Sequence, residues 1–279
     1  MNCGLLWNTY GGDIEWFKFS ARSYSKFARG FSAAKCVVPN PDVPAFRPIC
    51  EANGIHLVGF DEWPEKGFNH HQFLQCYGDA HFPQADAIFH IDADCVFGSE
   101  CSPSDWIIGG KILLPFVDFA NFLTRPVYPG EAMDFMGFHG LRSDFNRGCY
   151  WWKFATDVAV GWPVIRECMQ WMPIVHYREV YPKVREVVAS QHGVSFEEYV
   201  KGCRNSFPQS FCEFNTLGAI AHKFFQEQYI WHDIRSHGYP FAGKIVQCHS
   251  HSGFEKPHAF PGEVGGFQTP RQLFERLGL

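Results

Sequence analysis

Short apolar runs alternate with longer amphipathic segments over the first ninety residues. Each run has four to six residues and is bounded by polar residues, Gly or Pro, which predicts strands at 3–7, 35–38, 55–60 and 87–91. The intervening segments carry apolar residues at helical spacing, which predicts helices at 13–27, 45–53 and 70–81. Alternating strands and helices are typical of βαβ units, so we expect an α/β fold with a mostly parallel central sheet flanked by helices.

The pattern is less regular after about residue 118. Residues 121–150 are rich in Gly, Phe and charged side chains, which favours a long loop region over the site. Further elements are predicted as helices at 164–171, 179–192 and 210–225 and a strand at 244–249. Thr269 is the expected N-cap of a short C-terminal helix whose first residue is Pro270.

Two aspartates directly follow the predicted strand at 87–91, in Asp92-Ala93-Asp94, and the apolar segment 95–97 follows them. Ligands of open α/β sheets gather at the carboxyl ends of strands, so these acids stand where chemistry is expected. A solvated turn is the structural alternative, but the apolar residues on both sides argue against it. Two carboxylates suit a hard cation such as Mg²⁺ or Mn²⁺, which keeps positions open for substrate phosphates.

The segment 89–96, Phe-His-Ile-Asp-Ala-Asp-Cys-Val, resembles the DxD segment of glycosyltransferases with the GT-A fold. The resemblance implies a Rossmann-like domain, a divalent cation and a nucleotide-diphosphate sugar as donor, with a UDP-sugar expected first. It also implies that Asp94 binds the metal directly and that Asp92 meets the metal or the donor ribose. The cation would neutralise the charge that develops on the diphosphate leaving group.

A late segment, 247–257, is similar to the His-x-x-Gly-x-x-Lys-Pro segment of retaining glycosyltransferases of the glycogenin type. The matching residues are Gly253, Lys256 and Pro257. By this resemblance Lys256 touches the donor diphosphate. Ser250 occupies the place of the family's ligating histidine, with His249 and His251 on either side, so either histidine is a candidate third ligand. A histidine ligand favours Mn²⁺ slightly over Mg²⁺. Two surface histidines on a polar turn are the alternative.

The donor is expected at the end of the first strand. By resemblance to the same fold, Thr9 and Tyr10 would meet the base or ribose, with Asp13 in the same segment; the alternative is a loop in which Gly12 or Asp13 starts the next helix. The helix before the DxD strand offers His71, Gln72 and Gln75 toward the donor. The Lys or Arg that is common there in the family is absent.

The segment 210–218 resembles a Ser/Cys-Glu-Phe/Tyr-Asn-x-x-Gly pattern of bacterial and viral proteins in this superfamily. The resemblance implies that Glu213 and Asn215 bind acceptor hydroxyls and that Glu213 acts as general base. A capping box of Ser210 and Glu213 is the structural alternative. Asp157 is a second candidate acceptor acid. A base at Glu213 would mean inversion, whereas the glycogenin-like segment favours retention.

Charge and cysteine content narrow the class of protein. The net charge is −5 and no Lys/Arg run stands out, which argues against binding to nucleic-acid phosphates. The 11 cysteines are scattered without a CxxC pair, which favours free thiols in a reducing compartment over disulfides or a zinc site. With no secretory segment and no transmembrane run, we expect a soluble, cytoplasmic protein.

These expectations assign residues 1–118 to a nucleotide-sugar-binding half and 119–279 to an acceptor-binding half, whose C-terminal segment returns to the metal site. The expected function is a metal-dependent glycosyltransferase with an unspecified acceptor: a glycan, a lipid, a protein or a modified nucleobase of the viral kind. The alternatives are another metal-dependent nucleotide enzyme, such as a nucleotidyltransferase, and a non-catalytic carbohydrate-binding protein, which the 17% aromatic content allows. The oligomeric state is not predicted.

Overall fold

A mostly parallel sheet lies at the centre of the computed structural model, which describes residues 1–64, 67–122, 152–169, 172–203, 211–248, 250, 253–255 and 269–279. Within these residues the sheet has five strands in the order β3-β2-β1-β4-β9. Their bounds are β1 Cys3–Asn8, β2 Ala33–Pro39, β3 His56–Phe60, β4 Ala87–Ile91 and β9 Ile174–Tyr177. All neighbours pair in parallel except β9, which runs antiparallel to β4. The expected α/β fold is confirmed.

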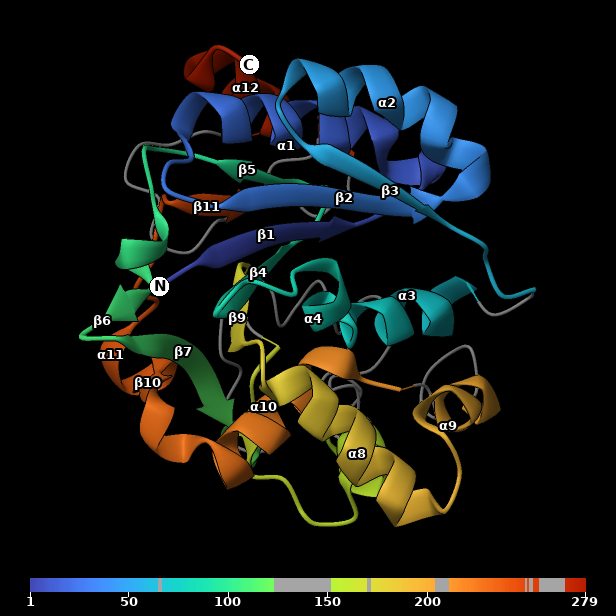
Figure 1. Cartoon of the computed structure of the whole chain (residues 1–279). Coiled ribbons are helices and arrows are strands. Elements are labelled where there is room, and N and C mark those ends of the chain that lie inside the picture. The colour runs from blue at the N-terminus through green and yellow to red at the C-terminus, as the bar shows by residue number, and fades with distance from the viewer. Residues whose placement is uncertain are drawn as a thin grey trace.

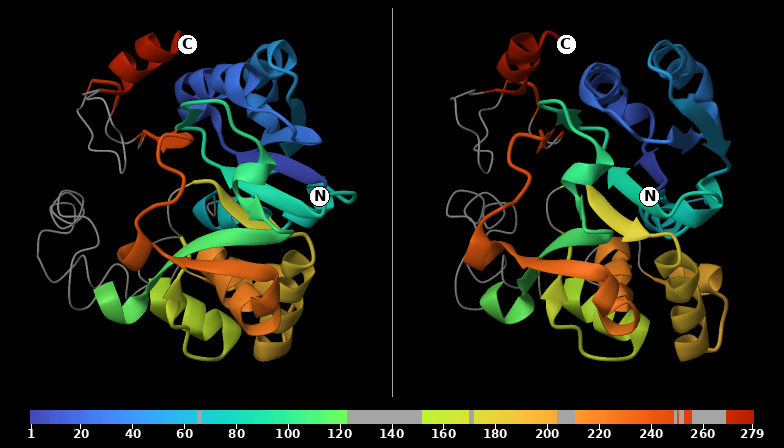
Figure 2. Two further views of the ribbon diagram at one scale, coloured as in Figure 1. Left: turned by 90° about the vertical axis from the view of Figure 1, so that its left-hand side faces the viewer. Right: turned by 60° about the vertical axis from the view of Figure 1, so that its left-hand side comes forward.

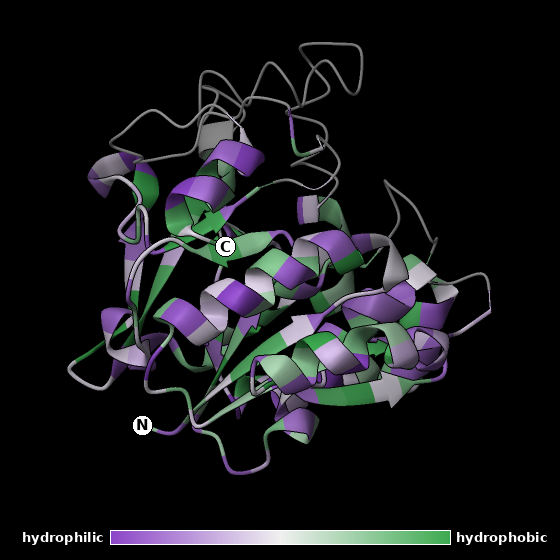
Figure 3. Cartoon of the chain, turned by 90° about the horizontal axis from the view of Figure 1, so that it is seen from above, coloured by the Kyte–Doolittle hydropathy of each residue, from purple (hydrophilic) through white to green (hydrophobic). Residues whose placement is uncertain are grey.

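Helices cover both faces of this sheet (Figures 1 and 2). One face carries α1 (Ile14–Phe27) and α2 (Val43–Ala52), with α12 (Pro270–Leu277) beside α1. The other carries α3 (Gly67–Gln75), α4 (Gly78–His81), α8 (Val180–His192) and α10 (Glu213–Phe224). In Figure 3 the strands are mostly in the hydrophobic colour, whereas the surrounding helices carry both colours. Burial on both faces explains why the strands appear in the sequence as uninterrupted apolar runs.

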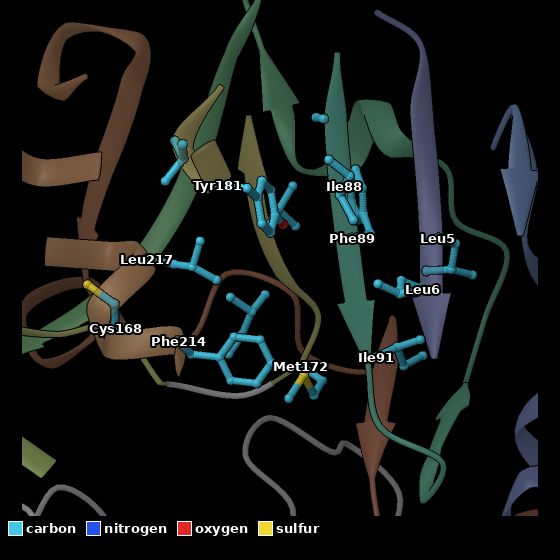
Figure 4. Packing of buried hydrophobic residues seen from close by; sticks show 14 of the residues in the cluster. Leu5, Leu6, Ile88, Phe89, Ile91, Cys168, Met172, Tyr181, Phe214 and Leu217 are labelled. Atoms are coloured by element: carbon cyan, nitrogen blue, oxygen red, sulfur yellow. The ribbon is translucent and has the colours of Figure 1, made fainter. Parts of the chain in front are cut away.

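The core beneath the second face joins the sheet to α8 and α10. Figure 4 shows the side chains of β1 and β4 opposite Tyr181 of α8 and Phe214 and Leu217 of α10, and all of these are buried. This packing places the first residues of α10 near the ends of the central strands.

Smaller elements extend the fold. A second parallel pair is formed by β7 (Lys111–Asp118) and β10 (Tyr229–Asp233), and β7 also pairs antiparallel with β6 (Ile107–Ile108) and β8 (Arg166–Glu167). The strand β5 (Cys95–Phe97) pairs antiparallel with β11 (Ile245–Gln247). The remaining helices are α5 Phe119–Phe122, α9 Phe196–Gly202 and α11 Ile234–His237, the helical residues 152–160, and the 3-10 turns η1 Gly11–Asp13, η2 Asn40–Asp42, η3 Pro103–Asp105 and η4 Gln226–Gln228.

Locally encoded elements agree with the sequence predictions. The first four strands, the helices α1, α2 and α8, and the late strand at β11 lie within a few residues of their expected positions. Thr269 caps α12 and Pro270 is its first residue, as expected, and Gln272 completes a capping box. Cys3, Cys36, Cys50, Cys76, Cys95, Cys101, Cys168 and Cys212 are free thiols. In the same ranges, no helix combines the length and apolarity that a bilayer crossing requires.

Two predictions of helical segments are wrong, and one structural alternative is excluded. The expected helix at 70–81 is two helices, since α3 ends at Gln75 and α4 begins at Gly78. At Gly78 the backbone packs closely on α8, where a Cβ would lie 3.0 Å from the Tyr181 ring. The segment 164–171 contains β8, which cross-strand bonding to β7 stabilises instead of a helix. The helix expected at 210–225 is present as α10, Glu213–Phe224, with Cys212 as its N-cap. Because Glu213 is the first helical residue, the alternative of a capping box between Ser210 and Glu213 is excluded. Ser210, and residues 123–150 of the expected loop, lie outside the described residues.

Close packing of α10 against the chain after β8 requires glycine at position 218. A Cβ there would lie 2.4 Å from Cys168 Cβ and 2.6 Å from its Sγ. We therefore expect Gly218→Ala to lower the free energy of unfolding by about 1–3 kcal/mol, although alanine is the better helix former. Gly202→Ala in α9 meets nothing within 4 Å and is the matched control, with unchanged or slightly increased stability. Urea unfolding measures both, and a Gly218→Ala protein as stable as wild type would contradict this packing.

Candidate active site

Two neighbouring parallel strands end at the same edge of the central sheet. β1 and β4 pair so that Trp7 lies opposite Ile91, and each strand ends within one residue of that pair. From β1 the sheet continues on one side to β2 and β3 and on the other to β4. This edge is therefore a topological switch point, the place where open α/β sheets bind ligands. Thr9 follows β1 there, and Asp92 follows β4.

The C-terminal segment fixes the two aspartates that follow β4. Gln247, the last residue of β11, donates a hydrogen bond from Nε2 to Asp92 Oδ2 at 3.0 Å. The backbone N–H of Cys248 donates to the Asp94 carbonyl at 2.8 Å, and that of Ser250 donates to Asp94 Oδ2 at 2.7 Å. Both carboxylates are thus held by groups more than 150 positions later in the sequence. Such hydrogen bonds fix the orientation of ligating carboxylates.

Four acidic side chains act on one another at this edge. Burial raises the pKa of Asp92 well above its ordinary value, and the nearby charges of Asp94, Glu213 and Asp13 raise it further. Burial and the charge of Asp94 also raise the pKa of Asp13, while a hydrogen bond with the Ser250 side chain lowers it. Within the described ranges, none of the four forms an ion pair with a lysine or arginine. The site therefore brings together acidic side chains that no lysine or arginine of the described residues pairs with.

Glu213 is the most deeply buried of these acids. It is the first residue of α10, 6% exposed, and its Oε2 is buried without a hydrogen-bond partner among the described residues. Burial raises its pKa from 4.5 to about 7. A carboxyl group with this pKa can exchange a proton near neutral pH.

The oxygen atoms left over at the two aspartates fit a hard divalent cation. Each Oδ2 accepts a hydrogen bond from the late segment, whereas among the described residues Asp92 Oδ1 has no partner and Asp94 Oδ1 contacts only the Cys95 thiol. Carboxylate oxygens are the ligands that Mg²⁺ and Mn²⁺ prefer. The described side chains alone do not form a group of three or more metal-binding residues. The predicted ligands His249 and His251, like Lys256, lie outside the described residues.

The predicted donor residues occupy two neighbouring elements. Thr9 is buried and its Oγ1 has no partner, whereas Tyr10 is 54% exposed. The charge of Asp13 raises the pKa of Tyr10. Asn8 Nδ2 donates to the backbone carbonyl of His71 at 2.9 Å, which ties the end of β1 to α3, and leaves Asn8 Oδ1 buried without a partner.

On α3, Gln72 has an amide oxygen that is free to accept a hydrogen bond from a ligand. Gln72 is 8% exposed and its Oε1 has no hydrogen-bond partner. Gln75 instead bonds His90 Nδ1 at 2.6 Å, inside the core, and lies 3.3 Å from His71 Nε2. Burial, with a smaller effect of the His70 charge, lowers the pKa of His71 to about 4, so this imidazole is neutral at pH 7.

The structure does not bring Asp157 to the acidic group. Its two carboxylate oxygens accept from Lys153 Nζ at 2.6 Å and from the backbone N–H of Val164 at 2.7 Å, both within the same stretch of chain. Asn215 likewise bonds backbone: its Oδ1 accepts from the N–H groups of Cys168 and Met169 at 2.7 and 3.2 Å. These contacts support local structural roles for both side chains.

Sequence reasoning missed three side chains at this edge: Asn8, Gln247 and the hydroxyl of Ser250. Asn8 carried one usable indication, because a polar residue that ends a buried strand stands at the ligand-binding edge. The other two lie in the late segment 247–257 that the sequence singled out, but their hydrogen bonds to the acids arise from the pairing of β11 with β5.

Comparisons with known proteins give limited information. No protein-family model and no curated protein matches the sequence. Among solved structures, the chain is similar to mouse xyloside xylosyltransferase 1 in its apo form, with 10% identity over 90% of this chain and 99% of that chain and a TM-score of 0.44. The functional assignment of the chain therefore rests on its own side chains.

The raised pKa of Glu213 makes stability depend on pH. In the unfolded chain Glu213 ionises near pH 4.5, but in the folded protein only near pH 7, so the folded state loses stability as pH rises between these values. The shift corresponds to about 3 kcal/mol at pH 8, which Glu213→Gln should recover.

Urea unfolding in EDTA at about pH 5 and pH 8 measures this effect. Glu213→Gln should exceed wild type in stability by much more at pH 8 than at pH 5. The exposed Glu186→Gln, which removes an ion pair with Lys183, is the control and should show no such difference. An equal effect of Glu213→Gln at both pH values would show that Glu213 is not held protonated by burial.

Proposed function

We propose that this chain is a divalent-cation-dependent glycosyltransferase of the GT-A type, which transfers a sugar from a nucleotide-diphosphate donor to an acceptor hydroxyl. The observation that carries the proposal is the group of four acids, Asp13, Asp92, Asp94 and Glu213, at the switch point between β1 and β4. Two features point to a ligand there: the charges have no counter-ion among the described side chains, and Glu213 Oε2 is buried without a partner.

Asp92 and Asp94 are the proposed cation ligands. A bound Mn²⁺ or Mg²⁺ would neutralise the charge that develops on the departing diphosphate. Gln247 and the N–H of Ser250 keep the two carboxylates oriented, so that the unbonded oxygens stay available. His249 or His251 as a further ligand, and Lys256 at the diphosphate, are proposals from the resemblance of the late segment to glycogenin-type enzymes.

The end of β1 is proposed to bind the nucleoside. Asn8 Oδ1 and Thr9 Oγ1 are buried polar atoms without partners, and Gln72 Oε1 on the adjoining helix is a third. Buried polar atoms without partners are costly, so a ligand that supplies the missing hydrogen bonds is favoured here. Uridine diphosphate is the nucleotide we propose first.

Glu213 is the proposed proton acceptor for the acceptor hydroxyl. Its pKa of about 7 and the effect of its charge on Asp92 support this role, which belongs with inversion of the anomeric centre. The late Gly-x-x-Lys-Pro segment instead supports retention, in which the departing phosphate takes the proton. The anomeric configuration of the product decides between the two.

The reaction is tested by incubating the protein with a panel of nucleotide sugars in Mn²⁺ or Mg²⁺ and analysing the products. We expect nucleoside diphosphate and free sugar, even without an acceptor, and loss of this activity in EDTA. Asp94→Asn should lower the rate at least about 100-fold, because it removes a charged ligand. Asp105→Asn is the matched control, since Asp105 pairs with Lys244 and should leave the rate unchanged.

Two outcomes would contradict the proposal. Release of pyrophosphate would identify a nucleotidyltransferase. Unchanged metal-dependent binding of nucleotide sugars by Asp94→Asn would show that Asp94 holds no cation, and would favour a carbohydrate-binding protein without catalysis.

A further inference from the structure

A second polar feature lies at the carboxyl end of the other parallel pair, β7 and β10. Arg166, the first residue of β8, lies opposite Asp118 at the end of β7. Its guanidinium carbon is 4.3 Å from the centre of the Phe116 ring and 4.7 Å from that of Trp231. The two rings, one from β7 and one from β10, are edge-to-face to one another, and both contact the same permanent positive charge.

Two nitrogens of the Arg166 guanidinium have no hydrogen-bond acceptor among the described residues. Its Nε and one terminal nitrogen, Nη1, are buried and have no partner. The neighbouring carboxylate of Asp118 forms no ion pair with it within the described residues. Ring stacking satisfies none of the N–H donors, so the charged group retains unmet hydrogen-bonding capacity.

Arg185 shows how the same chain satisfies a comparable arginine. It too stacks on a ring, with its guanidinium carbon 4.3 Å from the centre of Tyr77. Both of its terminal nitrogens bond Asp79 at 2.7 Å, and one also bonds the Cys76 carbonyl at 2.7 Å. Both terminal nitrogens of Arg185 are therefore bonded, whereas Nε and Nη1 of Arg166 have no partner among the described residues.

The position of Arg166 connects it to the proposed active site. The Trp231 ring that covers Arg166 also contacts the His222 ring, at 5.1 Å between centroids. His222 and Glu213 belong to the same helix, α10, and nine positions of helix span about 14 Å. Through Trp231, the Arg166 guanidinium therefore adjoins the part of α10 that contains His222. The strands β7 and β10, which carry the two rings, lie side by side in Figure 1.

We infer that Arg166 is an anion-binding residue that takes a phosphate or carboxylate group of the acceptor. Arginine binds such groups with its planar fork, and the aromatic rings pre-organise the fork for them. The oxygen atoms of a bound anion would accept hydrogen bonds from Nε and Nη1, which have no partner among the described residues. This inference rests on the proposed glycosyltransferase function only in calling the ligand an acceptor; anion binding itself does not depend on it.

Direct binding tests the inference without any turnover. Phenyl phosphate and benzoate are titrated by calorimetry into the full chain in EDTA, so that no metal-bound anion contributes, with phenol as the uncharged comparison. We expect saturable binding of at least one of the two anions and none of phenol. The anion that binds distinguishes a phosphorylated from a carboxylated acceptor.

Variants assign the binding to Arg166. Arg166→Met should weaken binding at least tenfold, and Arg166→Lys, which keeps the charge but loses the fork, should weaken it to a lesser degree. Arg185→Lys is the matched control and should bind like wild type. Absence of anion binding by wild type, or equal binding by wild type, Arg166→Met and Arg166→Lys, would overturn the inference.

Donor hydrolysis separates this result from the proposed function. Arg166→Met should hydrolyse nucleotide sugars in Mn²⁺ at the wild-type rate, because Arg166 does not touch the acidic group. Normal hydrolysis without anion binding would refute only the acceptor subsite. Anion binding without hydrolysis would refute only the glycosyltransferase.

Discussion

Mutual repulsion between buried carboxylates is the constraint on which the rest of this structure depends. Asp92 and Asp94 are held beside Asp13 and Glu213, and the described part of the chain provides no cationic partner for them. Bringing such groups together costs free energy, which the fold offsets elsewhere. The backbone amide of Ser250 and the side chain of Gln247 reduce this cost by bonding one oxygen of each DxD aspartate. A cation that binds the remaining oxygens would remove most of the repulsion.

The topology of the chain creates this arrangement from distant segments. The sheet brings the ends of β1 and β4 together, α10 delivers Glu213 from the opposite layer, and β11 returns the late segment to β5. The helix α10 begins at Glu213 in the acidic group, and its His222 ring contacts the Trp231 ring that also contacts Arg166. The proposed donor site and the proposed acceptor subsite therefore both adjoin α10.

The sequence predicted those parts of the fold that depend on local pattern. β1 and β4 are buried on both faces and so appear as continuous apolar runs, and Thr269 and Pro270 mark α12 by capping alone. The segment at 164–171 was predicted wrongly, because β8 forms through pairing with β7 and bonding to Asn215, neither of which is visible locally. The position of Asp92 and Asp94 at the end of a strand could be predicted, because an apolar run directly precedes the DxD motif. The hydrogen bonds from Gln247 and Ser250, and the burial of Glu213, are products of tertiary structure alone.

The location of the cation is the most direct test of the account. Crystals of the protein soaked in Mn²⁺ with uridine diphosphate, and measured at the manganese absorption edge, would show the ion by its anomalous scattering. The account predicts an anomalous peak within bonding distance of the Asp94 carboxylate, about 2.0–2.2 Å, with Asp92 as its neighbour. A fully occupied manganese peak elsewhere, with both aspartates uncoordinated, would contradict it.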